Sequence, residues 1–460
     1  MKLDLSPSIL KINSINYEEI FETKNRWQSW LDVEAALALS QSKIGMIPRK
    51  VGKKIANKCK LSKLNIKNIE RDLKKKGHKL VPIIWELTRA CDQESKKYVH
   101  WGATTQNIVS NGDLIILKKF HKTILNEISE ILSDLSKLSL TTKDYLMVAR
   151  THGQHALPTT FGFKVACWID EISRHVERLY DSEKRVFRCI FGGATGSAAS
   201  FGKYGLRIQE NIAKKLNLLS ASIPTRSHLD HFTEYTNILI MISVTFGKIA
   251  NEIYNLMKNE ISEVEEPMNS NDVGSSTMPQ KRNPHLTQDV ISLSVECKSL
   301  YSISLESMLN EHEGSRQHHL MSNTSLFKSC KITGEILSLS KYILKNMKIK
   351  PEKMKKNLKI SEGTIISESI MLKLGEKIGR QKSHDIIHKI LNETMQDEKD
   401  FLKLLKKNKD FKKSVSLSEL DELINPRNYI GLSSKFAMEQ SKFAKSLVKK
   451  IKKKRFILSN

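Results

Sequence analysis

The chain has 460 residues, of which 39% are hydrophobic and 27% are charged; this balance is typical of a folded protein and excludes a wholly disordered one. Its 76 basic and 50 acidic residues give a formal charge of +26. Lysines spread along the chain carry most of this excess, and the arginine clusters interleaved with aromatic residues that are typical of nucleic-acid grooves are missing. We therefore expect solvated basic helix faces and no nucleic-acid partner.

The sequence gives no sign of a membrane segment, a secretion signal or a metal site. The most apolar run, "ILIMISV" at 238–244, is far shorter than the about 18 residues that a membrane span needs. The N-terminus lacks an apolar signal core, so we expect a cytoplasmic protein. The six cysteines form no C-x-x-C pair, so we expect neither a zinc site nor a disulfide framework. Because metal-ligand spacings are absent, we also expect no metal and no cofactor.

Long helices are predicted in chain order because ten prolines leave wide gaps between them. Apolar residues recur at helical or near-heptad spacing over 117–138, 165–179 and 238–256. Strand signals are nearly absent. The pattern predicts an all-α protein with an N-terminal helical domain (1–111), a central long-helix bundle (112–355) and a C-terminal helical domain (356–460).

Two polar segments interrupt this helical pattern. "HWGATTQN" at 100–107 places His100, Thr104 and Thr105 ahead of a helix, where donors suit a carboxylate or phosphate. Taken alone, this segment favours the simpler interpretation of a common N-cap cluster. "THGQHALPTT" at 151–160 should be extended before Pro158. Its histidine at 152 can donate a proton near neutral pH or cap the next helix, and the segment alone leaves both readings open.

A glycine-rich segment, "FGGATGSAASFG" at 191–202, resembles a phosphate-binding loop only superficially. It has no G-K-[ST] ending and no preceding strand. Close packing of helices or turns is the better interpretation.

The stretch "GSSTMPQKRNPH" at 274–285 ends a polar, turn-rich segment that begins near 262. Such a segment predicts an exposed loop that can act as a lid. Lys281 and Asn283 can grip a carboxylate while Ser275 reaches the adjacent carbon. The alternative is a flexible linker with incidental serines.

Together these segments resemble the fumarase/aspartase superfamily, whose signature loop is written G-S-S-x-M-P-x-K-x-N. "RTHGQHALPTTFGFK", "VHWGATTQN", "NRWQSWLDVEAALA" and "INPRNYIGLS" follow in the order expected of the branch of adenylosuccinate lyase and carboxymuconate cycloisomerase. The resemblance implies three helical domains and a homotetramer with active sites shared between subunits. It also implies a β-elimination that releases fumarate from a small anionic succinyl-type substrate.

The resemblance also implies roles for individual residues. Ser275 would be the base, Lys281 and Asn283 would hold the carboxylate, and His152 would be the acid that assists the leaving group. The substrate-binding residues would be Thr104, Thr105, Gln154, His78, His100, Ser276, Met278 and Arg316.

Departures from the family pattern leave the substrate open. The N-terminus lacks the Arg-Tyr pair of purine-pathway enzymes, and Gln288 stands where many relatives have a glutamate that pairs with the acid histidine. Adenylosuccinate or a related N-succinyl compound is the leading prediction. The alternatives are a carboxymuconate-type cycloisomerase and, in another class, a basic nucleic-acid-binding protein on an inactive lyase fold.

Overall fold

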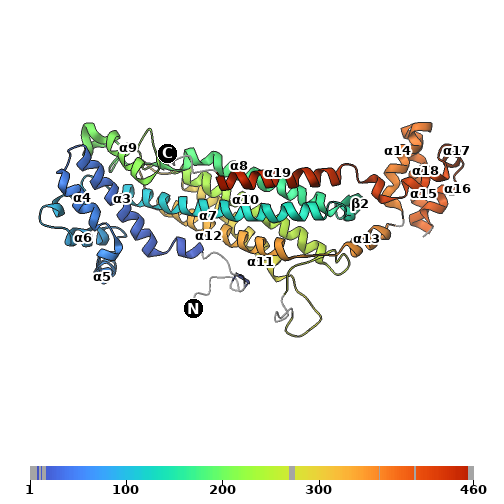
Figure 1. The fold of residues 1–460 in the computed structure, drawn as a ribbon, viewed down its shortest axis with the longest axis horizontal. Helices are drawn as coiled ribbons and strands as arrows, with labels where there is room; N and C mark the ends of the chain where they lie inside the picture. Colours follow the sequence, from blue (N-terminus) through green and yellow to red (C-terminus); the bar gives the residue numbers. More distant parts are fainter. Residues whose placement is uncertain are drawn as a thin grey trace.

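The computed structural model describes residues 8–9, 12, 17–268, 275–361, 363–397 and 400–453. The predicted all-α fold is confirmed, because long helices dominate an elongated molecule in which three regions follow one another along the long axis (Figure 1). Within the described ranges, no helix has the length and apolar character needed to cross a membrane.

The middle of the molecule is a bundle of long helices, in which α10, α11 and α12 pack on one another and α7 packs on α8 and α12. The predicted apolar stripes form its core: Ile124, Ile128 and Ile172, for example, are fully buried. The bundle helices are α7 (Thr105–Thr141), α8 (Phe161–Val186), α10 (Asp230–Met257), α11 (His285–Glu306) and α12 (Arg316–Asn346).

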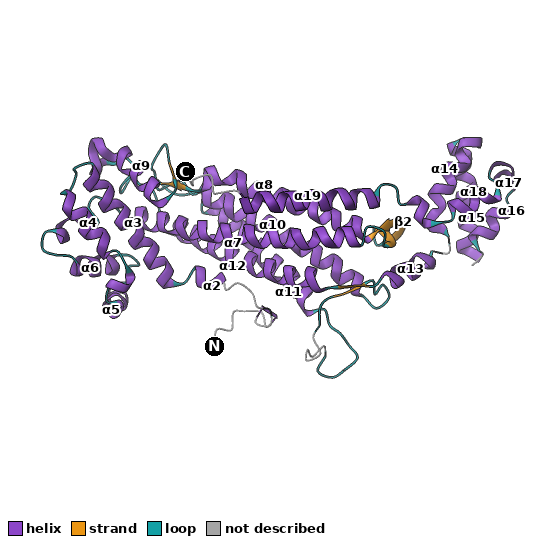
Figure 2. Ribbon diagram, viewed as in Figure 1, coloured by secondary structure: helices purple, strands orange, loops and turns teal. Residues whose placement is uncertain are grey.

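A further long helix, α19 (Ser433–Lys453), lies along the bundle although it follows the C-terminal region in sequence (Figure 2). It packs against α7 and α8. Small buried residues allow this close approach, as where the Ser441 hydroxyl donates to the backbone oxygen of Ser136 at 2.7 Å. The last described helix thus returns to the central bundle.

One end of the molecule holds the N-terminal helices and α9. Its elements are α2 (Tyr17–Ile20), α3 (Thr23–Lys43), α4 (Arg49–Lys58), η1 (Leu61–Lys63), α5 (Ile66–Lys76), α6 (Val81–Ala90), η2 (Ser95–Tyr98), η3 (Ala199–Tyr204) and α9 (Gly205–Leu216). Their apolar side chains join those of the bundle in one continuous core. Helix α3 lies close to α7, since a Cβ at Gly112 would meet the Trp30 ring at 2.4 Å.

The opposite end holds smaller helices around a second core that includes Ile370, Leu374 and Phe401. Its elements are α13 (Pro351–Ile360), η4 (Thr364–Ile366), α14 (Ser367–Ile378), α15 (Arg380–Asp397), α16 (Phe401–Lys407), α17 (Lys409–Ser414), α18 (Leu417–Leu423) and η5 (Pro426–Tyr429). The predicted limits at 111 and 355 stay predictions, although the first falls within α7 and the last domain would include α19.

The strands in the described residues are short and form two-stranded pairs. β1 (Leu146–Thr151) and β2 (Gln154–Thr160) form an antiparallel hairpin. The other pairs are β3 (Arg188–Cys189) with β4 (Leu219–Ser220), which is parallel, and β5 (Val264–Glu265) with β6 (Lys348–Ile349), which is antiparallel.

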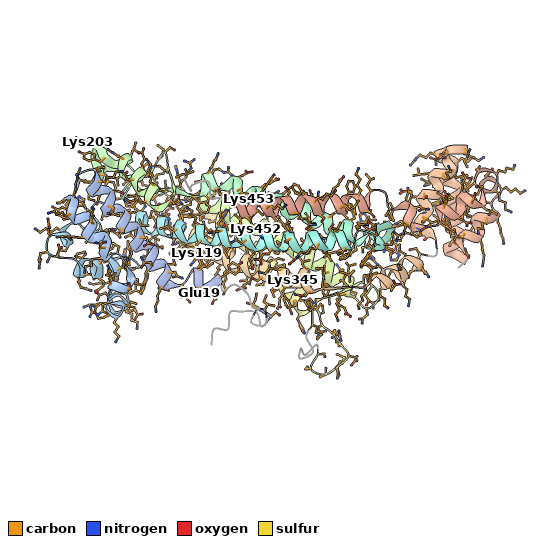
Figure 3. All side chains as sticks on the ribbon, viewed as in Figure 1. Glu19, Lys119, Lys203, Lys345, Lys452 and Lys453 are labelled. Atoms are coloured by element: carbon orange, nitrogen blue, oxygen red, sulfur yellow. The ribbon has the colours of Figure 1, made fainter. Side chains whose placement is uncertain are left out.

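The basic surface is dispersed over the molecule. Figure 3 labels exposed lysines that belong to separate elements, with Lys119 on α7, Lys203 on η3, Lys345 on α12 and Lys452 on α19. This distribution agrees with solvated helix faces. The densest basic stretch of the sequence continues into 454–460, which lies outside the described residues.

Candidate active site

The candidate site residues lie at two distant regions of one chain. Helix α7 has 37 residues and is therefore about 55 Å long. Thr104 and Thr105 lie at its N-terminus, while the hairpin that carries His152 follows its C-terminus. The signature loop lies on the hairpin side of the bundle, because α11 starts beside the last turns of α10, where a Cβ at Gly247 would contact Ser294.

His152 lies at the tip of the β1–β2 hairpin. Thr151 pairs with Gln154, so His152 and Gly153 form a two-residue turn, and their φ angles are +54° and +77°. Two positive φ angles define the type I′ turn that suits a twisted hairpin. The left-handed conformation is strained for a histidine, and such strain concentrates at functional sites. The segment is extended as predicted, and His152 and Gln154 are both exposed.

A buried ion pair anchors this hairpin. The Arg150 guanidinium donates to both carboxylate oxygens of Glu263, at 2.9 and 3.1 Å. Glu263 is fully buried and also accepts from the Asn357 amide at 2.7 Å. Glu263 immediately precedes β5, so the pair ties the His152 hairpin to the root of the signature loop.

His155 is held at the second strand of the hairpin and is less available than His152. Its Nδ1 lies 2.7 Å from the Ser361 hydroxyl. Burial and the nearby Arg150 lower the pKa of His155. A neutral, hydrogen-bonded His155 supports the hairpin, whereas His152 at the tip remains open to a ligand.

The described part of the signature loop begins at Ser275, and Gly274 lies outside the described residues. The Ser275 hydroxyl accepts from the Met278 backbone N–H at 3.2 Å, which closes a turn. Ser276, Met278 and Lys281 are exposed, and Asn283 is half-buried. The loop therefore presents its polar groups outward, as expected for a segment that closes over a ligand.

Glu266 links the segment before this loop to the helix that follows it. Its carboxylate accepts from the backbone N–H groups of Leu286 and Thr287 at 3.1 and 3.0 Å. These amides belong to the second and third residues of α11, whose N-cap, Pro284, provides no side-chain bond. A carboxylate from before the loop thus caps the helix after it.

A groove beside the loop gathers part of the predicted site, although Ser275 and His152 do not line it. Lys281, Asn283 and Gln288 line it, together with Glu265 and Lys350. Glu265 and Lys350 form an ion pair of 2.6 Å. The structure thus brings Gln288 next to the carboxylate grip, and the effect of its neutral amide on His152 stays a prediction.

At the other end of α7, His100 is paired with a buried acid. Its Nδ1 lies 2.5 Å from an oxygen of Glu34, which is only 1% exposed. The adjacent Thr104 and Thr105 are half-buried at the start of α7, and the Thr104 N–H donates to the side chain of Asn107 at 3.2 Å. These groups form a polar cluster at a helix N-terminus.

His78 and Arg316 lie at this end as well. The Nδ1 of His78 accepts from the N–H groups of Leu80 and Val81, so Nε2 carries the proton and is available to a ligand. Burial lowers the pKa of the adjacent Lys79, which feels the charges of Asp113 and Arg316. Arg316 is the exposed first residue of α12.

Three further basic groups lie at this end and are absent from the residues predicted from the sequence. Among the described residues, the Nε2 atoms of His231 and His319 and the Nε of Arg226 are buried without a hydrogen-bond partner. Burial lowers the pKa of both histidines to about 4, with Arg226 and Lys79 contributing at His319. The signal that could have found them is the density of basic residues in "TRSHLDH" and "SRQHH".

The glycine-rich segment is confirmed as a packing element. A Cβ at Gly192 would lie 2.4 Å from the backbone oxygen of Pro224, and one at Gly196 would lie 2.6 Å from Thr225. The glycines let this segment approach the chain that leads to Arg226.

Comparison with known proteins identifies the family of the chain. A family model described as "Lyase" matches residues 11–295, and one described as "Adenylosuccinate lyase C-terminus" matches residues 363–439. The chain therefore belongs to this lyase family, in the fumarase/aspartase superfamily, which confirms the predicted family and the predicted enzyme class of an adenylosuccinate lyase-like lyase.

Individual relatives carry different activities in their names. N-acetyl-S-(2-succino)cysteine lyase of Enterococcus italicus is 35% identical over 413 residues, covering 90% of this chain and 90% of that protein. Adenylosuccinate lyase of Pyrococcus horikoshii is 34% identical over 430 residues, covering 92% and 94%. The structure of 3-carboxy-cis,cis-muconate lactonizing enzyme from Pseudomonas putida has a TM-score of 0.86 and 26% identity, covering 95% and 98%.

Proposed function

We propose that this enzyme cleaves a succinyl-type substrate by β-elimination and releases fumarate. The observation that carries the proposal is the turn that holds His152 exposed at strained, positive φ, in a chain that retains Ser275, Lys281 and Asn283 on its outward-facing loop. Strain of this kind persists when a precise side-chain position is needed.

The chemistry assigns each group a task. Ser275 takes the proton beside a carboxylate, and Lys281 and Asn283 stabilise the charge that then builds on oxygens already anionic. His152 gives its proton to the leaving atom as the carbon–heteroatom bond breaks. Gln154, Thr104 and Thr105 bind carboxylates, and closure of the loop excludes water.

The active site would be shared between subunits of a homotetramer. One chain cannot bring together groups at opposite ends of a helix about 55 Å long. The bundle surface also suits association, because α10 and α11 expose apolar side chains, which mark interaction surfaces. These include Met241, Val244, Val295, Tyr301, Ile303 and Leu305.

The leaving group would carry a further anion. Arg226 lies with His231 beside the N-terminal end of the site, and its charge acts on the nearby His319 together with that of Lys79. The positive charge of Arg226 and Lys79 would favour an anionic ligand. Adenylosuccinate carries a phosphate in addition to its succinyl carboxylates, and N-acetyl-S-(2-succino)cysteine has a third carboxylate. We therefore expect an amine or thiol leaving group with an anionic tail.

A substrate panel tests the proposal directly. Purified protein is incubated with adenylosuccinate, N-acetyl-S-(2-succino)cysteine, argininosuccinate, aspartate and malate, and fumarate is followed by its ultraviolet absorbance. We expect release from at least one succinyl compound, and Ser275→Ala should reduce kcat by at least about 100-fold. Fumarate release that Ser275→Ala leaves unchanged would remove this serine from the mechanism.

Subunit sharing has its own test. Ser275→Ala and His152→Ala variants are mixed under conditions that exchange subunits. If loop and hairpin of one site come from different chains, about one quarter of the sites regain both groups under random assembly. A mixture as inactive as its components would place Ser275 and His152 of one chain in the same site.

A carboxymuconate-type cycloisomerase is the second candidate, and the Pseudomonas putida structure supports it. Adding 3-carboxy-cis,cis-muconate to the panel, with lactone formation as the readout, distinguishes the two.

A further inference from the structure

His100 and Glu34 form a hydrogen-bonded pair, called the dyad below, in which a buried carboxylate faces an imidazole. Glu34 lies on α3, 66 residues away in sequence, and its carboxylate meets Nδ1 of His100 at 2.5 Å. The His100 side chain is 21% exposed while Glu34 is almost inaccessible. A ligand at this end of the site would meet Nε2, the ring nitrogen that Glu34 does not use.

The backbone fixes the ring in this place. His100 has a φ of +59°, a left-handed conformation that is uncommon for a histidine. The next residue is tied to the same helix, since the Gln41 amide donates to the Trp101 backbone oxygen at 2.8 Å. Glu34 and Gln41 lie seven residues apart on one face of α3, so this face holds both side chain and backbone of the turn.

The electrostatic effect of Glu34 is to keep the ring charged. Burial by itself would lower the pKa of His100, but the charge and hydrogen bond of Glu34 raise it above its usual value. No other charged group among the described residues contributes to this shift. Glu34 also acts on a neighbouring thiol: burial raises the pKa of Cys59, and the charge of Glu34 raises it further, with smaller contributions from Cys91 and Asp32.

We propose that Glu34 is a positioning residue that holds His100 as an imidazolium, whose Nε2–H donates to a carboxylate of the bound substrate. The inference rests on the proposed function, because it needs a dicarboxylate at the start of α7. Thr104 and Thr105 supply neutral donors there, and the imidazolium supplies the charge. A charged donor binds a carboxylate more strongly than a neutral one.

Fumarate binding tests this without requiring turnover. The affinity of fumarate is measured by calorimetry from pH 6 to pH 8.5 for the wild type, Glu34→Gln and Gln41→Ala. Glutamine keeps the shape and one acceptor but removes the charge, so the His100 pKa falls. We expect Glu34→Gln to bind within about threefold of the wild type at pH 6 and at least about tenfold more weakly at pH 8.

Gln41→Ala is the matched control, because it loosens the same turn and leaves the charge of the dyad unchanged. We expect the fumarate affinity of Gln41→Ala to change with pH by the same factors as that of the wild type. If Glu34→Gln also lowered affinity by the same factor at every pH, the role of Glu34 would be structural and the proposal would be overturned. If the wild type bound no fumarate, the proposed function itself would fail.

Discussion

The ion pair between Arg150 and Glu263 offers a sharp test of how the site is held. Glu263 is fully buried, and among the described residues its carboxylate accepts side-chain hydrogen bonds from Arg150 and the Asn357 amide. Arg150→Met would leave the buried charge without its counterion. Removing one partner of a buried pair costs about 3–5 kcal/mol, and the strain would fall on the hairpin that Arg150 belongs to.

Hydrogen exchange of the hairpin amides measures this cost. Local opening that becomes easier by about 3–5 kcal/mol speeds exchange by at least about 100-fold wherever opening limits it. We expect residues 146–160 to show this effect while the centre of the bundle stays protected. We also expect kcat to fall, because His152 at the tip loses its fixed position.

Two controls separate the buried pair from a general loss of charge. Arg174→Met removes an exposed pair with Asp170 on α8, and such pairs contribute only about 0.3–0.5 kcal/mol. Arg150→Met combined with Glu263→Leu removes both buried charges and should restore much of the protection, since Asn357 keeps its bond to the Ile261 oxygen. Hairpin exchange equal to that of the wild type in Arg150→Met would refute the argument.

Two further predictions concern the loop and the bundle. Glu266→Ala removes the acceptor for the Leu286 and Thr287 amides; it should cost about 1 kcal/mol at the start of α11 and lower kcat more than it changes KM, as steady-state kinetics would show. His175 has its pKa lowered to about 4 by burial and then by Arg178. In the unfolded chain His175 binds a proton from about pH 6.5 downward, whereas in the folded chain it stays neutral until about pH 4. The free energy of unfolding is therefore unaffected by His175 above about pH 6.5 and falls between that pH and pH 4, by up to about 1.4 kcal/mol per pH unit. His175→Gln should therefore reduce the difference between the free energies of unfolding that urea titrations give at pH 7 and at pH 5. An unchanged difference would exclude His175 as a cause of this pH dependence.

The sequence predicted the long helices because their evidence is local. Apolar residues at helical spacing, in stretches free of proline, became the buried face of α7, α8 and α10. The polar breaks likewise marked the segments that hold His100, His152 and Ser275. The structure that such a polar segment adopts depends on the residues it contacts in the fold. The type I′ hairpin was not foreseen, because a His-Gly turn lacks the usual Asn-Gly signal.

The residues that support the site could not be found from sequence, because their partners are distant along the chain. Glu34 meets His100 across 66 positions, and Glu263 meets Arg150 across 113. In a sequence, an isolated glutamate within a helix or beside a loop predicts an exposed, solvated charge. Only the folded chain shows that these acids are buried.

These acids share one function in the architecture. Each polar segment of the site is anchored by one buried glutamate: His100 by Glu34, the hairpin by Glu263 and the signature loop by Glu266, which are 1%, 0% and 9% exposed. Burying a carboxylate is costly unless it is paired and hydrogen-bonded. The exposed groups that contact the substrate can then lie in polar, open segments, because the buried glutamates order these segments before the substrate binds. An enzyme whose site assembles from distant segments needs such anchors at every one of them, since a shift of one segment would misalign groups contributed by the others.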